Sequence, residues 1–117
     1  MARNVTGEPY TRISSKEADE MVNAGDATVI DVRREDEYRG GHVKGAIWIP
    51  VDDVIPRFDD LPKKGKLLFI CEVGARSGLA AEYAAAMGAD TNRLFNIEDG
   101  TGTWIGNGLP YATGDEK

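Results

Sequence analysis

The strongest fold signal in this chain is a strand, a short loop and a helix that follow one another around the only cysteine. Residues 66–70 form an apolar run introduced by Lys-Lys-Gly, and they predict a buried parallel strand. Residues 77–87 are rich in good helix formers and stop at Gly88, which suits the left-handed position past a helix end. Cys71 therefore stands where a strand ends and a helix follows.

The loop after this strand favours a reactive sulfur. It reads Cys-Glu-Val-Gly-Ala-Arg-Ser, with four residues between Cys71 and Arg76. In a strand-loop-helix unit the backbone amides of residues 72–76 converge above the sulfur, and the helix start adds a partial positive charge. A free thiol has a pKa of about 8.5, whereas cysteines at helix amino termini lie at roughly 3.5 to 7.5. We therefore expect Cys71 to be a thiolate at neutral pH.

The rest of the chain alternates between short apolar runs and helical patterns. A capping box of Ser14 with Glu17 predicts a helix that ends at Gly25, and shorter helical or turn segments are expected at 35–39 and 51–58. This order predicts an α/β fold, a parallel sheet with helices on both faces. The expected division is a loose arm over 1–9, one domain over 10–113 and a tail over 114–117. Strands are expected near 10–13, 28–31, 46–49, 67–70 and 93–97.

Composition excludes several kinds of function. The net charge of −6 argues against a nucleic-acid partner, because such binding depends on basic patches. One cysteine forms no internal disulfide, and with one histidine it supplies no closed zinc site. No apolar stretch is long enough for a membrane span, and the first residues lack the apolar core of a secretion signal, so a cytoplasmic location is expected.

Other polar and aromatic residues have competing interpretations. Asp31 ends a short apolar strand, so Asp31 and Arg33 could flank the same crevice as Cys71, but we favour a structural role in which they pair with each other or cap backbone groups. His42 lies between a glycine and a valine, and it is expected to bond to backbone in a turn rather than to act as a base. The indoles of Trp48 and Trp104 are interpreted as packed hydrophobic groups.

Three segments together resemble the single-domain rhodanese family. Residues 71–77 look like its active-site loop, and residues 31–50 resemble its signature of Asp-Val-Arg, Glu-Tyr, Gly-His and Gly-Ala. Residues 100–110 are similar to its second signature. The resemblance implies a five-stranded parallel sheet with helices on both faces, and a Cys71 that accepts sulfane sulfur as a persulfide. It also implies that no metal or organic cofactor is required.

The chain departs from the family pattern at two places. Asp99-Gly100 replaces a common Gly-Gly pair, and Glu72 follows the cysteine where many relatives carry neutral or basic residues. A carboxylate that pointed inward would raise the pKa of the thiol and disfavour anionic donors, whereas one that pointed outward would be solvated. The orientation of Glu72 is left open by the sequence.

The leading hypothesis is a sulfurtransferase. Cys71 is its catalytic nucleophile, and the substrate-binding loop comprises Glu72, Val73, Gly74, Ala75, Arg76 and Ser77. The amides would hold the transferred sulfur, Arg76 would steady the loop or the donor charge, and Ser77 would add a hydrogen bond. Asp31 and Arg33 are secondary candidates. The expected partners are a small sulfur donor, such as thiosulfate or a persulfide, and a thiol, cyanide or protein acceptor.

Two alternatives accompany this hypothesis. Phosphatases and arsenate reductases of related folds are associated with five residues between cysteine and arginine, whereas this chain has four. A persulfide carrier or partner-binding module, with little turnover on small donors, would agree with Glu72 and with an acidic surface that docks a basic partner.

Overall fold

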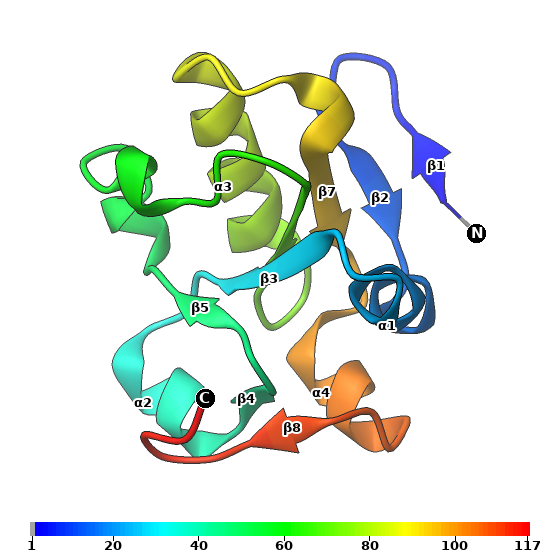
Figure 1. Ribbon diagram of the computed structural model, residues 1–117, viewed down its shortest axis with the longest axis vertical. Helices are drawn as coiled ribbons and strands as arrows, with labels where there is room; N and C mark the ends of the chain where they lie inside the picture. Colours follow the sequence, from blue (N-terminus) through cyan, green and yellow to red (C-terminus); the bar gives the residue numbers. More distant parts are fainter. Residues whose placement is uncertain (1) are drawn as a thin grey trace.

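The computed structural model describes residues 2–117, and its centre is a six-stranded sheet (Figure 1) in the order β1-β2-β7-β6-β3-β5. Five strands are parallel to their neighbours, which confirms the predicted parallel sheet. The sixth, β1, pairs antiparallel with β2 at one edge. The strands are β1 (Arg3–Asn4), β2 (Thr11–Ile13), β3 (Ala27–Asp31), β5 (Ile47–Trp48), β6 (Lys66–Ile70) and β7 (Leu94–Ile97).

Alternate side chains of β6 divide the core into two halves. Leu67 and Phe69 face the helix α3 (Ala75–Ala86) and the 3₁₀ turns η1 (Val51–Asp53) and η2 (Phe58–Asp60). Leu68 and Ile70 face α1 (Ser15–Asn23) and α4 (Gly100–Gly106). These four side chains are buried, as expected for a central parallel strand with helices on both faces.

Local sequence explains the ends of the longer helices. Ser14 accepts a hydrogen bond from the Glu17 amide at 3.1 Å, and the Glu17 carboxylate accepts one from the Ser14 amide at 2.8 Å, which confirms the predicted capping box of α1. Gly25 and Gly88 follow α1 and α3 with φ of +100° and +102°, values that favour glycine. A 3₁₀ turn, η3 (Thr91–Arg93), then leads into β7.

Helix α4 is not predicted by its local sequence. Three of its seven residues are glycine and two are threonine, so its intrinsic helix propensity is poor. The buried Trp104 anchors it against the core, and the indole Nε1 donates to the Pro110 carbonyl at 2.9 Å. Tertiary packing therefore stabilises a helix that local sequence does not favour.

Both ends of the chain contact the rest of the domain. Gly114 donates its amide to the Arg39 carbonyl at 2.8 Å, and Asp115 pairs with the Arg39 side chain. The chain end thus lies beside α2 (Glu35–Gly40) and β4 (His42–Val43), and β4 pairs antiparallel with β8 (Tyr111–Ala112) (Figure 1). At the other end, β1 lies within the segment predicted to be loose; residue 1 is outside the described residues.

Candidate active site

Cys71 directly follows β6 and is buried, with 1% of its surface exposed. The Gly74 amide donates a hydrogen bond to its Sγ at 3.1 Å, and the Ser77 hydroxyl lies 3.2 Å from the same atom. Gly74, with φ of +90°, is the N-cap of α3. The helix begins at Ala75, within the loop and two residues earlier than the sequence predicted. The sulfur therefore lies at the amino end of a twelve-residue helix.

The surroundings of Cys71 lower its pKa below the ordinary value of a thiol. Burial alone raises the pKa, because it penalises the thiolate. Hydrogen bonds from the Ser77 hydroxyl and from the amides of Ser77, Val73 and Gly74 outweigh that penalty. The nucleophilic form is thus stabilised by neutral donors rather than by a contacting cation.

Close backbone packing fixes the shape of the loop. Gly100 has φ of +79°, and a Cβ at this position would lie 1.9 Å from the Glu72 carbonyl oxygen. The Cys71 carbonyl accepts two hydrogen bonds from Thr101, from its amide at 2.9 Å and from its hydroxyl at 3.1 Å. Asp99, one of the two departures from the family pattern, accepts a hydrogen bond from the Ser15 hydroxyl at 2.6 Å and connects this turn to α1.

Arg76 is directed toward α2. Its guanidinium makes a bidentate contact with the Glu37 carboxylate, at 2.7 and 2.9 Å. This hydrogen-bonded pair lowers the pKa of Glu37 to about 2. Of the two roles that the sequence allowed for Arg76, the geometry supports steadying of the loop.

The buried side chain of Arg33 connects three segments near the cysteine loop. It pairs with Asp31 through Nη2 at 2.7 Å, donates to the Gly41 carbonyl at 2.7 Å and contacts the Glu72 carboxylate through Nη1 at 2.6 Å. Asp31 and Arg33 thus form the mutual pair that the sequence favoured. Glu72 is 44% exposed and its carboxylate is held by Arg33 at the surface, which answers the question of its orientation.

Asn96 is a residue near the sulfur that sequence reasoning missed. It lies on β7, is 1% exposed, and contacts both Ser77 and Gly74. Its only signal in the sequence is a polar side chain inside the apolar run Leu-Phe-Asn-Ile. Such an interruption in a buried strand indicates a polar partner nearby, because a buried amide requires hydrogen bonds.

The other polar and aromatic candidates have structural contacts. Both nitrogens of the His42 ring lie against backbone carbonyls, those of Tyr38 and Glu116, as the predicted turn role requires. The Trp48 indole donates to the Arg33 carbonyl at 2.8 Å, and its ring stacks on Tyr38. Trp104 is buried, in agreement with a packing role.

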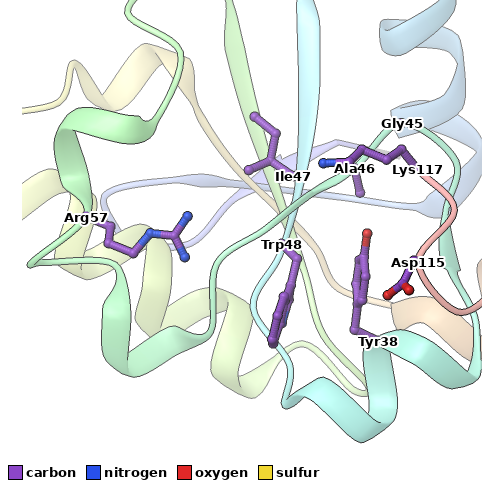
Figure 2. Close-up of a pocket in the computed structure, with 8 residues that line it drawn as sticks. All are labelled: Tyr38, Gly45, Ala46, Ile47, Trp48, Arg57, Asp115 and Lys117. Carbon is purple, nitrogen blue, oxygen red and sulfur yellow. The ribbon is translucent and has the colours of Figure 1, made fainter.

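Two surface hollows lie near these elements, and Cys71 lines neither of them. One, of about 310 Å³, lies beside the loop and is lined by Glu72, Arg33, Asp36, Glu37, Thr101, Ile105 and three glycines. The other, of about 470 Å³, lies at the β5 edge, where Tyr38 and Trp48 face each other and Arg57 points in from another segment (Figure 2).

Within residues 2–117, no cluster of histidine, cysteine, aspartate and glutamate has the geometry of a metal site. None of the described helices has the length and apolar character needed to cross a membrane.

The comparisons with known proteins agree with this geometry. Residues 14–107 match the family model of the rhodanese-like domain. A rhodanese-related protein from Thermoplasma volcanium has the same fold, with a TM-score of 0.75 at 29% identity over 86% of this chain and 96% of that chain. A thiosulfate sulfurtransferase, GlpE of Actinobacillus pleuropneumoniae, is 26% identical over 91% of this chain and 96% of the relative.

Two further relatives are larger proteins. The HTH-type transcriptional regulator Rv0324 of Mycobacterium tuberculosis is 32% identical over 97% of this chain but only 50% of its own length. The putative sulfur carrier protein YrkF of Bacillus subtilis is 30% identical over 77% of this chain and 45% of its own length. The chain thus spans about half the length of these two relatives.

The parallel sheet and the cysteine loop at the head of α3 define an α/β domain of the rhodanese class. The chain belongs to the rhodanese-like domain family, whose model covers most of its length.

Proposed function

We propose that this protein is a sulfurtransferase that carries sulfane sulfur on Cys71. The observation that carries the proposal is the contact of Sγ with the Gly74 amide and the Ser77 hydroxyl at the start of α3. These donors favour the thiolate, the form of cysteine that acts as a nucleophile. The likeness to GlpE, a thiosulfate sulfurtransferase, supports the same chemistry.

The reaction has two displacement steps. In the first, the Cys71 thiolate attacks the sulfane sulfur of thiosulfate or of a persulfide; a new S–S bond forms, the donor's S–S bond breaks, and sulfite or a thiolate leaves. In the second, a thiol, cyanide or protein acceptor attacks the outer sulfur, and the bonding electrons return to the Cys71 thiolate. No net oxidation takes place, so the protein needs no redox cofactor.

The start of α3 holds the persulfide. The first amides of a helix have no intrahelical carbonyl partner, so the amides of Ala75 and Arg76 can donate to the outer sulfur. Val73, two residues after the buried Cys71, is 78% exposed, so the loop itself is at the surface. Negative charge on the outer sulfur is thereby matched by oriented dipoles.

The proposal is tested by sulfur transfer to cyanide, measured as thiocyanate, with both thiosulfate and a small persulfide as donors. Cys71→Ala should lose transfer from every donor while it unfolds at a similar urea concentration. Gly102→Ala is the matched control, because a Cβ at Gly102 meets nothing within 4 Å. Full activity of Cys71→Ala would refute the role of this cysteine.

A persulfide carrier is the second candidate, and the ion pairing of Arg76 and Arg33 favours it. Arg76 is occupied by Glu37, and Arg33 is occupied by Asp31 and Glu72. A dianion such as thiosulfate therefore meets oriented amides but no unpaired guanidinium. The likeness to the putative sulfur carrier YrkF supports this reading.

Glu72→Gln separates the two candidates, because it removes the carboxylate that lies 2.6 Å from Arg33 Nη1. Asp36→Asn is the control, since Asp36 lines the same hollow without contacting Arg33. If charge pairing limits thiosulfate use, Glu72→Gln should raise kcat/KM for thiosulfate and Asp36→Asn should change it little. Rapid thiosulfate turnover by the unmodified protein would instead exclude the carrier.

The paired arginine also disfavours phosphate-ester hydrolysis. A phosphatase loop needs its arginine to contact the bound oxyanion, whereas Arg76 is held by two hydrogen bonds to Glu37. Together with the four-residue spacing, this contact leaves sulfur transfer as the better supported chemistry.

A further inference from the structure

We propose that Asn96 is a positioning residue that controls the ionisation of Cys71 through the proton of Ser77. Asn96 lies on β7 and does not touch the sulfur; its side-chain amide bridges two loop residues that do. Its Oδ1 lies 2.6 Å from the Ser77 hydroxyl, and its Nδ2 lies 3.0 Å from the Gly74 carbonyl oxygen. For activity this inference rests on the proposed role of Cys71 as nucleophile, but thiol ionisation is measured without sulfur transfer.

The Gly74 carbonyl fixes which way the Asn96 amide faces. A carbonyl oxygen only accepts, so the Asn96 group turned toward it must be the NH₂ group. Oδ1 then faces Ser77, and because Oδ1 is also only an acceptor, any hydrogen bond between the two side chains uses the Ser77 proton. The orientation of one amide thus determines the direction of a hydroxyl 2.6 Å away.

A serine hydroxyl has a single proton. While Ser77 donates to Asn96, its lone pairs face the Cys71 sulfur at 3.2 Å, and this arrangement suits a protonated thiol that donates to Ser77. When Cys71 ionises, the thiolate needs a donor, and Ser77 supplies one only by turning its proton away from Asn96. Asn96 and the thiolate therefore compete for the same proton.

The second contact of Asn96, from its Nδ2 to the Gly74 carbonyl, should have little effect on the ionisation of Cys71. The Gly74 carbonyl also accepts from the Gly78 amide at 3.1 Å, so it keeps a partner when Asn96 is replaced. Gly74 itself is confined, because a Cβ there would lie 2.8 Å from the Glu98 carbonyl oxygen. The loop amide that donates to Sγ should therefore keep its place without Asn96.

Charged groups around the loop remain unchanged in an Asn96 variant. All of them have partners other than Asn96, so a change in thiol pKa is attributable to the Ser77 proton. They are Asp31 and Arg33 from β3 and the residues after it, Glu37 from α2, Glu72 and Arg76 from the loop, and Glu98 and Asp99 after β7.

The test is the pH dependence of Cys71 alkylation by iodoacetamide in the full chain. Asn96→Leu removes the competing acceptor while keeping the same branched arrangement of side-chain heavy atoms, so the Ser77 proton becomes available to the thiolate. The thiol pKa should fall by about half a unit to one unit, as expected for a hydroxyl that gains a bond to a charged group and loses one to a neutral amide. Asn96→Val, which suits a strand, repeats the measurement if Asn96→Leu does not fold.

Ser77→Ala is the control that distinguishes an effect through the Ser77 proton from a general structural effect of the Asn96 substitution. In a Ser77→Ala background, the Asn96 substitution should leave the thiol pKa unchanged, because the Ser77 hydroxyl proton is absent. An unchanged or raised pKa in Asn96→Leu or Asn96→Val with Ser77 present would overturn the inference. An equal fall in both backgrounds would overturn it too. If these pKa changes occur but the unmodified protein transfers no sulfur, the result counts against the proposed function alone.

Discussion

Replacement of Glu37 by glutamine should weaken the fold in a pH-dependent way. Glutamine keeps an oxygen that accepts from the Arg34 amide, now at 3.1 Å, so the start of α2 retains its cap. What it loses is the charged bidentate contact with Arg76, at 2.7 and 2.9 Å. The change therefore isolates the ion pair that holds the cysteine loop against α2.

The size of the effect follows from the lowered pKa of the carboxyl. Hydrogen bonding to Arg76 lowers the pKa of Glu37 from 4.5 to about 2, which is about 3 kcal/mol at roughly 1.4 kcal/mol for each tenfold change. The carboxylate is 16% exposed and the guanidinium 30% exposed, so water screens the pair. After this discount we expect Glu37→Gln to lose about 1 to 2 kcal/mol of unfolding free energy at pH 7.

The pH dependence has a definite sign. Because the folded-state pKa lies below the ordinary value, the stabilisation is complete above about pH 5 and is lost as the pH falls toward 2. Urea unfolding should thus show a difference between Glu37→Gln and the unmodified protein that shrinks from pH 5 to pH 3. Glu35→Gln is the control, since the described structure shows no ion pair or hydrogen bond for that neighbouring side chain. Equal losses in both variants, or a loss that does not vary with pH, would refute the reasoning.

Three further outcomes are expected. Gly100→Ala should lower the free energy of unfolding by about 3 kcal/mol or more, or prevent folding, because its Cβ would lie 1.9 Å from a carbonyl oxygen at φ of +79°. Gly102→Ala should be neutral or slightly stabilising, and urea unfolding compares the two variants. Thr101→Val should cost about 1 kcal/mol in the same assay, because it removes the hydroxyl bond to the Cys71 carbonyl but keeps the amide bond; no change would show that this hydroxyl is dispensable. Alkylation of Cys71 in the unmodified protein should have its midpoint below about 8.5, because loop donors lower the thiol pKa, and a midpoint above that value would contradict the described hydrogen bonds.

Much of the fold could be predicted because its signals are local. The apolar run of β6, the capping box at Ser14 and the glycine after α3 each determine structure within a few residues. The helix α4 could not be predicted in this way, since its glycines and threonines oppose a helix and its stability comes from Trp104 in the core. The position of the chain end likewise depends on a distant segment, since Gly114 bonds to Arg39, whereas β1 pairs with the nearby strand β2.

The residues of the candidate site that are contiguous in sequence could be predicted, but their partners from other elements could not. Cys71 and its loop are contiguous, so their juxtaposition follows from sequence order. The partners that complete the site come from other elements: Glu37 from α2, Asn96 from β7 and Thr101 from α4. Their spacing in the sequence does not indicate that these positions are close together, and only the structure shows that Arg76 is directed toward α2.

Intact-mass spectrometry after incubation with a persulfide donor tests the proposed function most directly. The unmodified protein should gain one sulfur atom on Cys71, and a later addition of cyanide or of a thiol should remove it. Cys71→Ala should gain none under the same conditions. A protein that acquires no sulfur from any donor, or a Cys71→Ala variant that is labelled to the same extent, would contradict a Cys71 persulfide.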